Sequence, residues 1–362
     1  MGVLSALAIL AGLVVVHEAG HFLAATLQGI RVSGFSIGFG PVLLERQIGT
    51  VQFALRAIPL GGFVSFPDDE EDSTIAADDP DLLRNRPLPQ RALVIAAGVL
   101  ANLLLAWLVL VGQGFSLGIP DGFASSAGVL VSGVQAGQPA AAAGLKSGDR
   151  IVKLQGSSIG GGQSAVQALV TEIQGAPGLP LDLEIARGSQ TLSLSLTPDD
   201  LAGRGRIGAQ LQPNGQELFR PAKGPGEVLA QATASWALLL QRTASGFATL
   251  ITHFGSTASQ VSGPVKIVEM GANLAQQGGG SLVAFAALIS INLAVLNALP
   301  LPLLDGGQFV LLLLEGLRGR PLPQRFELAF MQSGFVFLVG LSLVLIVKDT
   351  SQLAVVQQLL GR

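Results

Sequence analysis

The chain has 362 residues, of which 49% are hydrophobic and only 12% are charged. Soluble proteins carry about 25% charged residues, so this composition excludes an ordinary soluble globule and favours a protein with several membrane spans. The net charge of −3 argues against a nucleic-acid-binding protein, and the absence of cysteine excludes a disulfide framework and a thiolate metal site.

Four long apolar segments predict transmembrane helices, because a bilayer span needs about 20 apolar residues. They are residues 3–29, 92–120, 281–304 and 331–347. The first lacks a basic region at its start and is therefore expected to be a retained span rather than a cleaved signal peptide. The apolar run 309–314 is too short to be a further span.

The segment between the first two spans, 34–66, is predicted to form a small β-hairpin or sheet that lies against the membrane. Apolar and polar residues alternate through VQFALR, residues 51–56, which is the period of a strand. The acidic stretch that follows, 67–81, is expected to be a solvated and mobile linker.

Residues 122–200 differ in kind, because short alternating strands and turn-rich sequence predict a small α/β module inserted between the second and third spans. A linker and an amphipathic helix are expected to follow within 201–280. The helix, 228–254, has apolar residues near helical spacing, so it is expected to lie on the membrane surface or against the module. The two halves of the membrane core are then 1–120 and 281–362.

The hexapeptide RPLPQR occurs twice, at 86–91 and at 320–325, each time shortly before a span. Cytosolic loops are rich in Lys and Arg, so both copies are predicted to be cytosolic juxtamembrane anchors without a catalytic part. With four spans, both termini and the inserted module would then lie on the outer side of the membrane.

The motif that carries chemistry is HEAGH, residues 17–21, inside the first apolar run. His17 and His21 are four residues apart and share one helix face. In the H-E-x-x-H pattern the two histidines bind zinc, and the glutamate, here Glu18, is the general base. The alternative is a pair of buried histidines that hydrogen-bond other helices. A functional site is favoured, because ionisable residues are costly in lipid.

A zinc site needs a third protein ligand, and two residues are candidates. His253 is the only other histidine, but the topology places it outside the membrane. Asp305 is preferred, because it is the only charged residue in 270–314 and lies in the helix-breaking stretch NALPLPLLDGG. At about 1.5 Å per residue, His17 and Asp305 lie at similar depth, toward the cytosolic side. Nitrogen and oxygen ligands with an open fourth position fit Zn²⁺ best.

These segments together resemble the site-2 protease family of intramembrane zinc metalloproteases, in its bacterial form with one PDZ domain. The resemblance is nearly end to end and rests on HEAGH, FSIGFGP, IPLGGFV, AAGVLANLLLAW, AAAAGLKSGDRIVKLQG and NALPLPLLDGG. It implies a polytopic α-helical membrane protein with about four transmembrane helices, a membrane-associated β-hairpin or sheet after the first helix, and an inserted PDZ-like α/β module at 122–200.

The resemblance also implies the roles of individual residues. His17, His21 and Asp305 would bind Zn²⁺, and Glu18 would be the catalytic base. Residues that would shape the site and position the substrate are Asn297, Pro300, Pro302, Asn102 and Gly98. The family usually has proline after the glycine of the second span, where this chain has Val99. We expect that departure to change local helix shape more than chemistry.

Substrates implied by the resemblance are single-span membrane proteins already trimmed on the outer side, such as anti-sigma factors, or leftover signal peptides. Segment 34–66 would line the active site and pair with an unwound substrate strand. The PDZ-like module would either capture a peptide end by strand addition or only block access, and the sequence leaves both open. The expected location is a bacterial inner membrane, with the active site toward the cytosol.

Two other functions stay open at this stage. A non-catalytic membrane scaffold would bind partners through the inserted module, with the metal structural or absent. The absence of Glu18 or Asp305 would favour it, and both residues are present. A cation transporter would need acidic residues in several spans, and the second and fourth spans have none.

Overall fold

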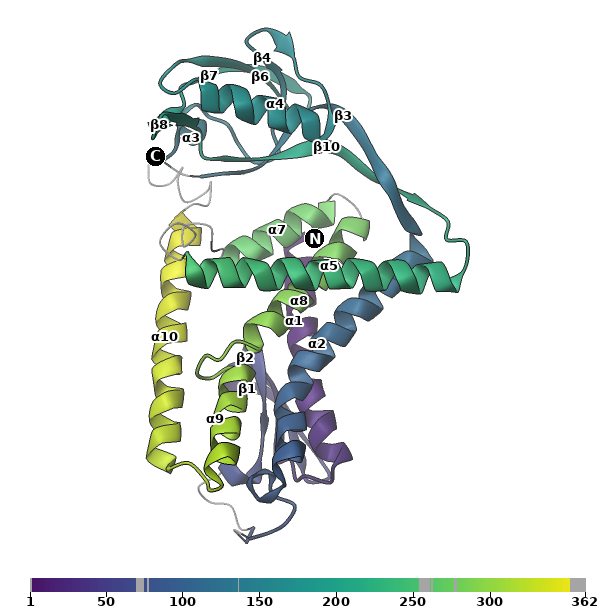
Figure 1. The fold of residues 1–362 in the computed structure, drawn as a ribbon, viewed down its shortest axis with the longest axis vertical. Coiled ribbons are helices and arrows are strands. Elements are labelled where there is room, and N and C mark those ends of the chain that lie inside the picture. The colour runs from purple at the N-terminus through teal and green to yellow at the C-terminus, as the bar shows by residue number, and fades with distance from the viewer. Residues whose placement is uncertain are drawn as a thin grey trace. The chain divides into compact units, whose positions relative to one another are not determined.

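Figure 1 shows the computed structural model of the chain. The structure describes residues 2–69, 75–76, 78–135, 137–253, 261, 263–276 and 279–351. These residues form two compact units. The membrane unit combines Met1–Leu117 with Ala222–Ser351, and the β-rich unit is Gly118–Pro221.

In the part of the chain that the structure describes, four helices are long and apolar enough to cross a membrane. They are α1 (Gly2–Leu27), α2 (Leu88–Ser116), α8 (Gly279–Asn297) and α10 (Gln324–Ser351). The prediction of four such helices is therefore confirmed. The third helix ends earlier than its apolar run, at Asn297, because Pro300 and Pro302 cannot continue a helix.

Both copies of the RPLPQR repeat lie at the start of a membrane helix, α2 or α10. In the first copy the arginines find partners inside the protein. Arg86 donates to the Gly29 carbonyl at 2.8 Å and pairs with Asp81 at 2.7 Å. Arg91 pairs with Glu315 at 3.0 Å, on the short helix α9 (Asp305–Arg318). This copy therefore joins elements of the membrane unit to one another.

The acidic linker is held at its end, where we expected mobility. Arg31 binds Asp79 at 3.2 Å, and its backbone N–H donates to the Asp81 carbonyl at 2.9 Å. Short 3₁₀ turns flank the linker at Pro67–Asp69 and Leu83–Asn85. Residues 70–74 and 77 of the linker lie outside the described residues.

The predicted hairpin is formed by β1 (Gly34–Ile48) and β2 (Val51–Ser65). Its tip pairs antiparallel from Ile48↔Val51 to Val42↔Arg56. Residues 34–37 pair with β2 twice, with 62–65 in the opposite direction and with 52–55 in the same direction. The two long strands therefore fold over into a small sheet in which 34–37 is central and 62–65 is an outer strand.

Helix α5 (Pro225–Thr252) lies across α2 and α8 (Figure 1). Trp236 fixes it there by donating its indole N–H to the Leu103 carbonyl at 2.9 Å, and Trp107 donates to Thr233 at 3.0 Å. The predicted helix 228–254 is confirmed as far as Thr252, and residue 254 lies outside the described residues. Helix α7 (Pro264–Gln276) is capped by Asp349, which accepts from the Lys266 N–H at 3.0 Å.

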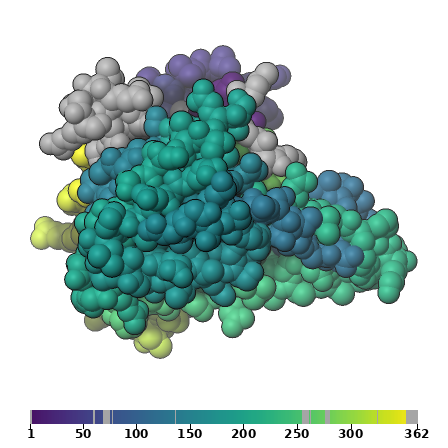
Figure 2. All heavy atoms as spheres, turned by 90° about the horizontal axis from the view of Figure 1, so that it is seen from above, coloured from purple at the N-terminus to yellow at the C-terminus, as the bar shows by residue number. Residues whose placement is uncertain are grey.

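The β-rich unit is built on a sheet with the strand order β10-β3-β4-β6-β7, and β5 pairs with β4. Its strands are β3 (Ile119–Val134), β4 (Arg150–Leu154), β5 (Ser157–Ser158), β6 (Leu181–Arg187), β7 (Gln190–Leu196) and β10 (Ala209–Arg220), with a separate pair β8 (Asp199–Leu201) and β9 (Arg204–Arg206). Helices α3 (Pro139–Ala142) and α4 (Gly162–Gly175) complete it. Val129, Val131 and Ile185 lie in its core. In the space-filling view of Figure 2 the atoms of this unit are drawn mainly as teal spheres.

The β-rich unit is longer than the predicted module 122–200. It includes β9 and β10, which fall in the range that the sequence assigned to a linker. Pro213 and Gly215 break the register of β10 against β3, so the apolar alternation that marks a strand is interrupted there.

A buried ion pair fixes the turn before β4. The Asp149 carboxylate is 1% exposed and accepts from Arg187 Nε, from Arg187 Nη2 and from the Lys146 N–H, each at 2.7 Å. Arg187 also donates to the Gly144 carbonyl at 2.7 Å. The hydrogen bonds to Asp149 raise the pKa of Arg187 above its ordinary value.

Candidate active site

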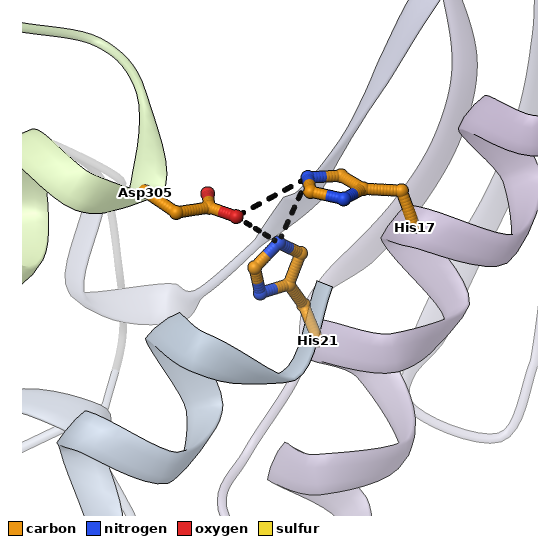
Figure 3. A group of neighbouring side chains, drawn as sticks. All are labelled: His17, His21 and Asp305. Carbon is orange, nitrogen blue, oxygen red and sulfur yellow. Dashed lines mark hydrogen bonds and ion pairs between the residues drawn. The ribbon is translucent and has the colours of Figure 1, made fainter. Parts of the chain in front are cut away.

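Three side chains from two helices converge in the membrane unit (Figure 3). His17 and His21 come from α1, and Asp305 is the first residue of α9. The Nε2 atoms of the two histidines are 3.3 Å apart, and Asp305 Oδ2 lies 3.3 Å from His17 Nε2 and 3.4 Å from His21 Nε2. The three side chains therefore point at one common position.

The triangle of ligand atoms fits a tetrahedral zinc ion. Zinc binds imidazole nitrogen at about 2.0–2.1 Å and carboxylate oxygen at about 2.0–2.2 Å, which gives tetrahedral edges of about 3.3–3.5 Å. Asp305 Oδ2 is buried, and among the described residues it has no hydrogen-bond partner beyond its ion-pair contacts with the two histidine nitrogens. A bound cation would compensate the charge of this buried oxygen. Among the described residues this is the group of His, Asp and Glu side chains that could hold a metal ion.

Helix α2 supports both histidines through residues spaced four apart. The Val94 carbonyl lies 2.8 Å from His21 Nδ1, and the Asn102 side-chain nitrogen lies 3.3 Å from His17 Nδ1. Gly98 lies between them, where a Cβ would overlap the rings of both histidines. A glycine at this position is what lets the imidazoles reach the position they share with Asp305.

The loop between α8 and α9 places Asp305. Leu303 has a φ of 72°, a left-handed conformation that is uncommon for a residue other than glycine. A Cβ at Gly306 or Gly307 would overlap carbonyl oxygens of this same loop, so the two glycines let the first turn of α9 fold back on it. The two glycines at the end of NALPLPLLDGG are therefore needed for the close packing of this loop.

Glu18 and Asn297 complete the surroundings of the three ligands. A Cβ at Gly62, in the outer strand 62–65 of the small sheet, would lie 2.9 Å from Glu18 Cγ. That strand therefore runs directly past the predicted base. Asn297, the last residue of α8, has its side-chain nitrogen 3.3 Å from His17 Nε2.

The structure brings most of the predicted site residues together, but not all in the expected surroundings. His253 follows the last residue of α5, is exposed and lies outside the cluster. Pro300 is exposed, and Pro302 is in contact distance of Gly334 on α10. The Asn102 side chain is 0% exposed and packs between helices, which leaves no surface for a substrate to touch.

Three contributors are missing from the sequence analysis as individual residues. The Val94 carbonyl is a backbone group, and no sequence pattern marks it. Ser290 on α8 donates to the Asn102 carbonyl at 2.8 Å, and its only signal was a hydroxyl inside an apolar span. Gly62 lies within the quoted motif IPLGGFV, but its packing against Glu18 depends on how the sheet folds.

Comparison with known proteins identifies the family of this chain. The pattern of peptidase family M50, the site-2 protease family, matches residues 5–341, which include all three candidate ligands. The chain belongs to this family. The resemblance to the site-2 protease family is thereby confirmed, and this chain is a zinc metallopeptidase.

Similar proteins of the family are found in cyanobacteria and in a plant. A protein of Nostoc sp. named "Putative zinc metalloprotease" is 50% identical over 98% of this chain and 97% of its own length. A protein of Synechocystis sp. with the same name is 46% identical over 99% and 97%. The "Membrane metalloprotease ARASP, chloroplastic" of Arabidopsis thaliana is 42% identical over 99% of this chain and 80% of its own length.

Proposed function

We propose that this chain hydrolyses peptide bonds within or near the transmembrane segments of single-span proteins, as in regulated intramembrane proteolysis. The observation that carries the proposal is the convergence of His17, His21 and Asp305 inside a bundle of membrane helices. The name of the Arabidopsis relative, a membrane metalloprotease, agrees with it. Pre-trimmed anti-sigma factors and signal-peptide remnants are the substrates that the family resemblance favours.

In this proposal His17, His21 and Asp305 hold the metal, and Glu18 moves the proton. When bound, zinc supplies Lewis-acid chemistry, which polarises a peptide carbonyl and makes water a nucleophile at neutral pH. Glu18 follows His17 in the helix, so its carboxylate reaches the attacking water without being a ligand itself. It takes the proton of that water and can return it to the leaving amine.

The outer strand 62–65 is the proposed docking edge for the substrate. A transmembrane helix hides its carbonyls in its own hydrogen bonds, so the substrate must unwind before cleavage. An unwound segment pairs with the free edge of a sheet through backbone hydrogen bonds. Gly62 would bring such a segment alongside Glu18. The Asn297 side chain, next to His17, would hold the substrate strand, and Pro300 and Pro302 would shape its path.

The β-rich unit is proposed to be a PDZ domain, on the resemblance of AAAAGLKSGDRIVKLQG to that fold. Whether it captures a peptide end or only restricts access stays open in the proposal. Both termini and this domain would lie on the outer side of a bacterial inner membrane, with the active site toward the cytosol. A non-catalytic scaffold is disfavoured, because Glu18 beside three converging ligands has no purpose in it.

The deciding experiment compares cleavage of a single-span model substrate by the wild type and by Glu18→Gln in the same detergent. Glu18→Gln removes the base and keeps every proposed ligand. Glu269→Gln, the same chemical change at an exposed position of α7, is the matched control. We expect the wild type and the control to cut within the span and Glu18→Gln to be inactive. Equal cleavage by all three chains would refute the proposed base.

A further inference from the structure

Asn102 is a buried side chain whose position does not suit the substrate-contacting role expected from the family resemblance. It is 0% exposed, and its backbone carbonyl accepts from Ser290 Oγ at 2.8 Å. Its amide lies against His17 Nδ1 at 3.3 Å. The amide therefore contacts a candidate metal ligand rather than any surface that a substrate could reach.

In the described part of the chain, only one of the two polar atoms of this amide has a hydrogen-bond partner. Asn102 Nδ2 faces His17 Nδ1, whereas Oδ1 is buried without a partner among the described residues. A buried amide oxygen without a partner destabilises the folded protein, so its position needs an explanation.

The protonation of His17 supplies that explanation. His17 Nε2 faces His21 Nε2, Asp305 Oδ2 and the side-chain nitrogen of Asn297, and in the proposed zinc site it offers its lone pair to the metal. In a neutral imidazole the proton then resides on Nδ1, which becomes a donor. Two donors cannot bond each other, so the metal-bound state requires Asn102 Oδ1 to face Nδ1. A half-turn of the amide gives that arrangement: Oδ1 gains the Nδ1 proton as its donor, and Nδ2 moves to the position that Oδ1 now occupies.

We infer that Asn102 is a positioning residue for His17: its Oδ1 accepts the Nδ1 proton and fixes the tautomer that leaves Nε2 free for zinc. The inference rests on the proposed metal site. It gives the two histidines matched supports from α2, since the Val94 carbonyl is placed to do the same for His21 at 2.8 Å. Such outer partners orient the ring and raise the basicity of the ligand.

The test measures zinc affinity by competition with a chelator, using the full chain in detergent. Asn102→Leu keeps the approximate volume and removes the acceptor, so we expect the zinc Kd to rise about 10- to 100-fold. Ser290→Ala is the matched control, because it alters the same buried interface without touching His17. We expect its zinc Kd to stay within about threefold of wild type, since surrounding packing is preserved.

Three results would overturn the inference: wild-type zinc affinity in Asn102→Leu, an equal loss in Ser290→Ala, or a tenfold loss in Asn102→Asp. The last variant keeps an acceptor at this position, so we expect it to hold zinc as tightly as wild type. It decides the matter if Asn102→Leu does not fold. A wild-type chain that binds no zinc would instead refute the proposed function. Wild-type zinc binding and cleavage, with an unchanged Kd in Asn102→Leu, would refute only the role of Asn102.

Discussion

Two aspartates of this protein are buried in opposite ways. Asp149, in the β-rich unit, has both carboxylate oxygens occupied by Arg187 and by the Lys146 N–H. Asp305, in the membrane unit, has an oxygen aimed at two histidine nitrogens, and no described residue donates a hydrogen bond to it. Both side chains are largely removed from water, so burial alone does not separate them.

The difference lies in what the protein itself provides to each carboxylate. A buried charge that is fully paired stabilises its surroundings when intact and destabilises them when one partner is removed. A buried charge left incomplete costs free energy until something from outside binds it. The first pattern is typical of a structural ion pair, and the second of a ligand site. Removing each aspartate should therefore have opposite consequences.

The largest effect is expected from Asp305→Ala. This change removes a ligand, so purified protein should carry little zinc and should show no cleavage of a single-span substrate. The metal-free variant should unfold at the same temperature as the metal-free wild type or higher, because a buried carboxylate that, among the described residues, has only the two histidines beside it is gone. Metal analysis and thermal unfolding in a chelator check both statements. Stoichiometric zinc in this variant would show that Asp305 is not a ligand.

Asp149→Ala should give the reverse pattern. The guanidinium of Arg187 and the turn around Lys146 lose their anion, which should destabilise the β-rich unit by about 3 kcal/mol. Zinc content and the Kd for zinc should not change. Amide hydrogen exchange on the full chain can follow the β-rich unit separately from the membrane unit. Unchanged exchange in 129–134 and 150–154 would contradict this prediction.

Gly98→Ala tests whether zinc binding beside Asp305 depends on the exact positions of the two imidazoles. The added methyl group would overlap both imidazoles, so zinc affinity should fall by a factor of about 10 to 100, as overpacking costs about 1–3 kcal/mol. Gly112→Ala is the control, since a Cβ at that position of α2 meets open space. Chelator competition on both variants gives the comparison. An equal Kd for the two would show that α2 does not limit the site.

Arg187→Lys should have the smallest effect. Lysine keeps the charge beside Asp149 but cannot make two parallel hydrogen bonds to its carboxylate, so a loss of about 1 kcal/mol is expected. The raised pKa of Arg187 means that its stabilisation is complete below its unfolded value and is lost only as pH rises through the folded one. Amide hydrogen exchange in the β-rich unit of the wild type should therefore show no loss of the stabilisation by the Arg187–Asp149 pair between pH 6 and about 10. A loss within that range would contradict it.

Most of the ligand set could be predicted from the sequence, because the ligands stand out in short local sequence patterns. His17 and His21 recur at the helical spacing that puts two imidazoles on one face, and Asp305 is a charge in an otherwise uncharged stretch. The apolar runs likewise reveal the membrane helices, since the bilayer sets their length.

The rest depends on contacts between distant segments. Alternation predicted strands in 34–66, but the double pairing of 34–37 follows from bulges and from packing against α1. The extent of the β-rich unit was hidden by Pro213 and Gly215 in β10. The expected substrate contact of Asn102 came from resemblance alone, whereas its burial follows from how closely α2 and α8 approach through Ala106 and Ala287.

The Val94 carbonyl affects how well this site tolerates amino-acid substitutions in α2. It is a main-chain atom, so no single amino-acid replacement can delete it while α2 stays helical. In a saturation library of α2, position 94 should accept other apolar side chains of similar volume, whereas positions 98 and 102 should each accept few residue types. The support of one histidine is therefore protected from point mutation, and the support of the other is fully exposed to it.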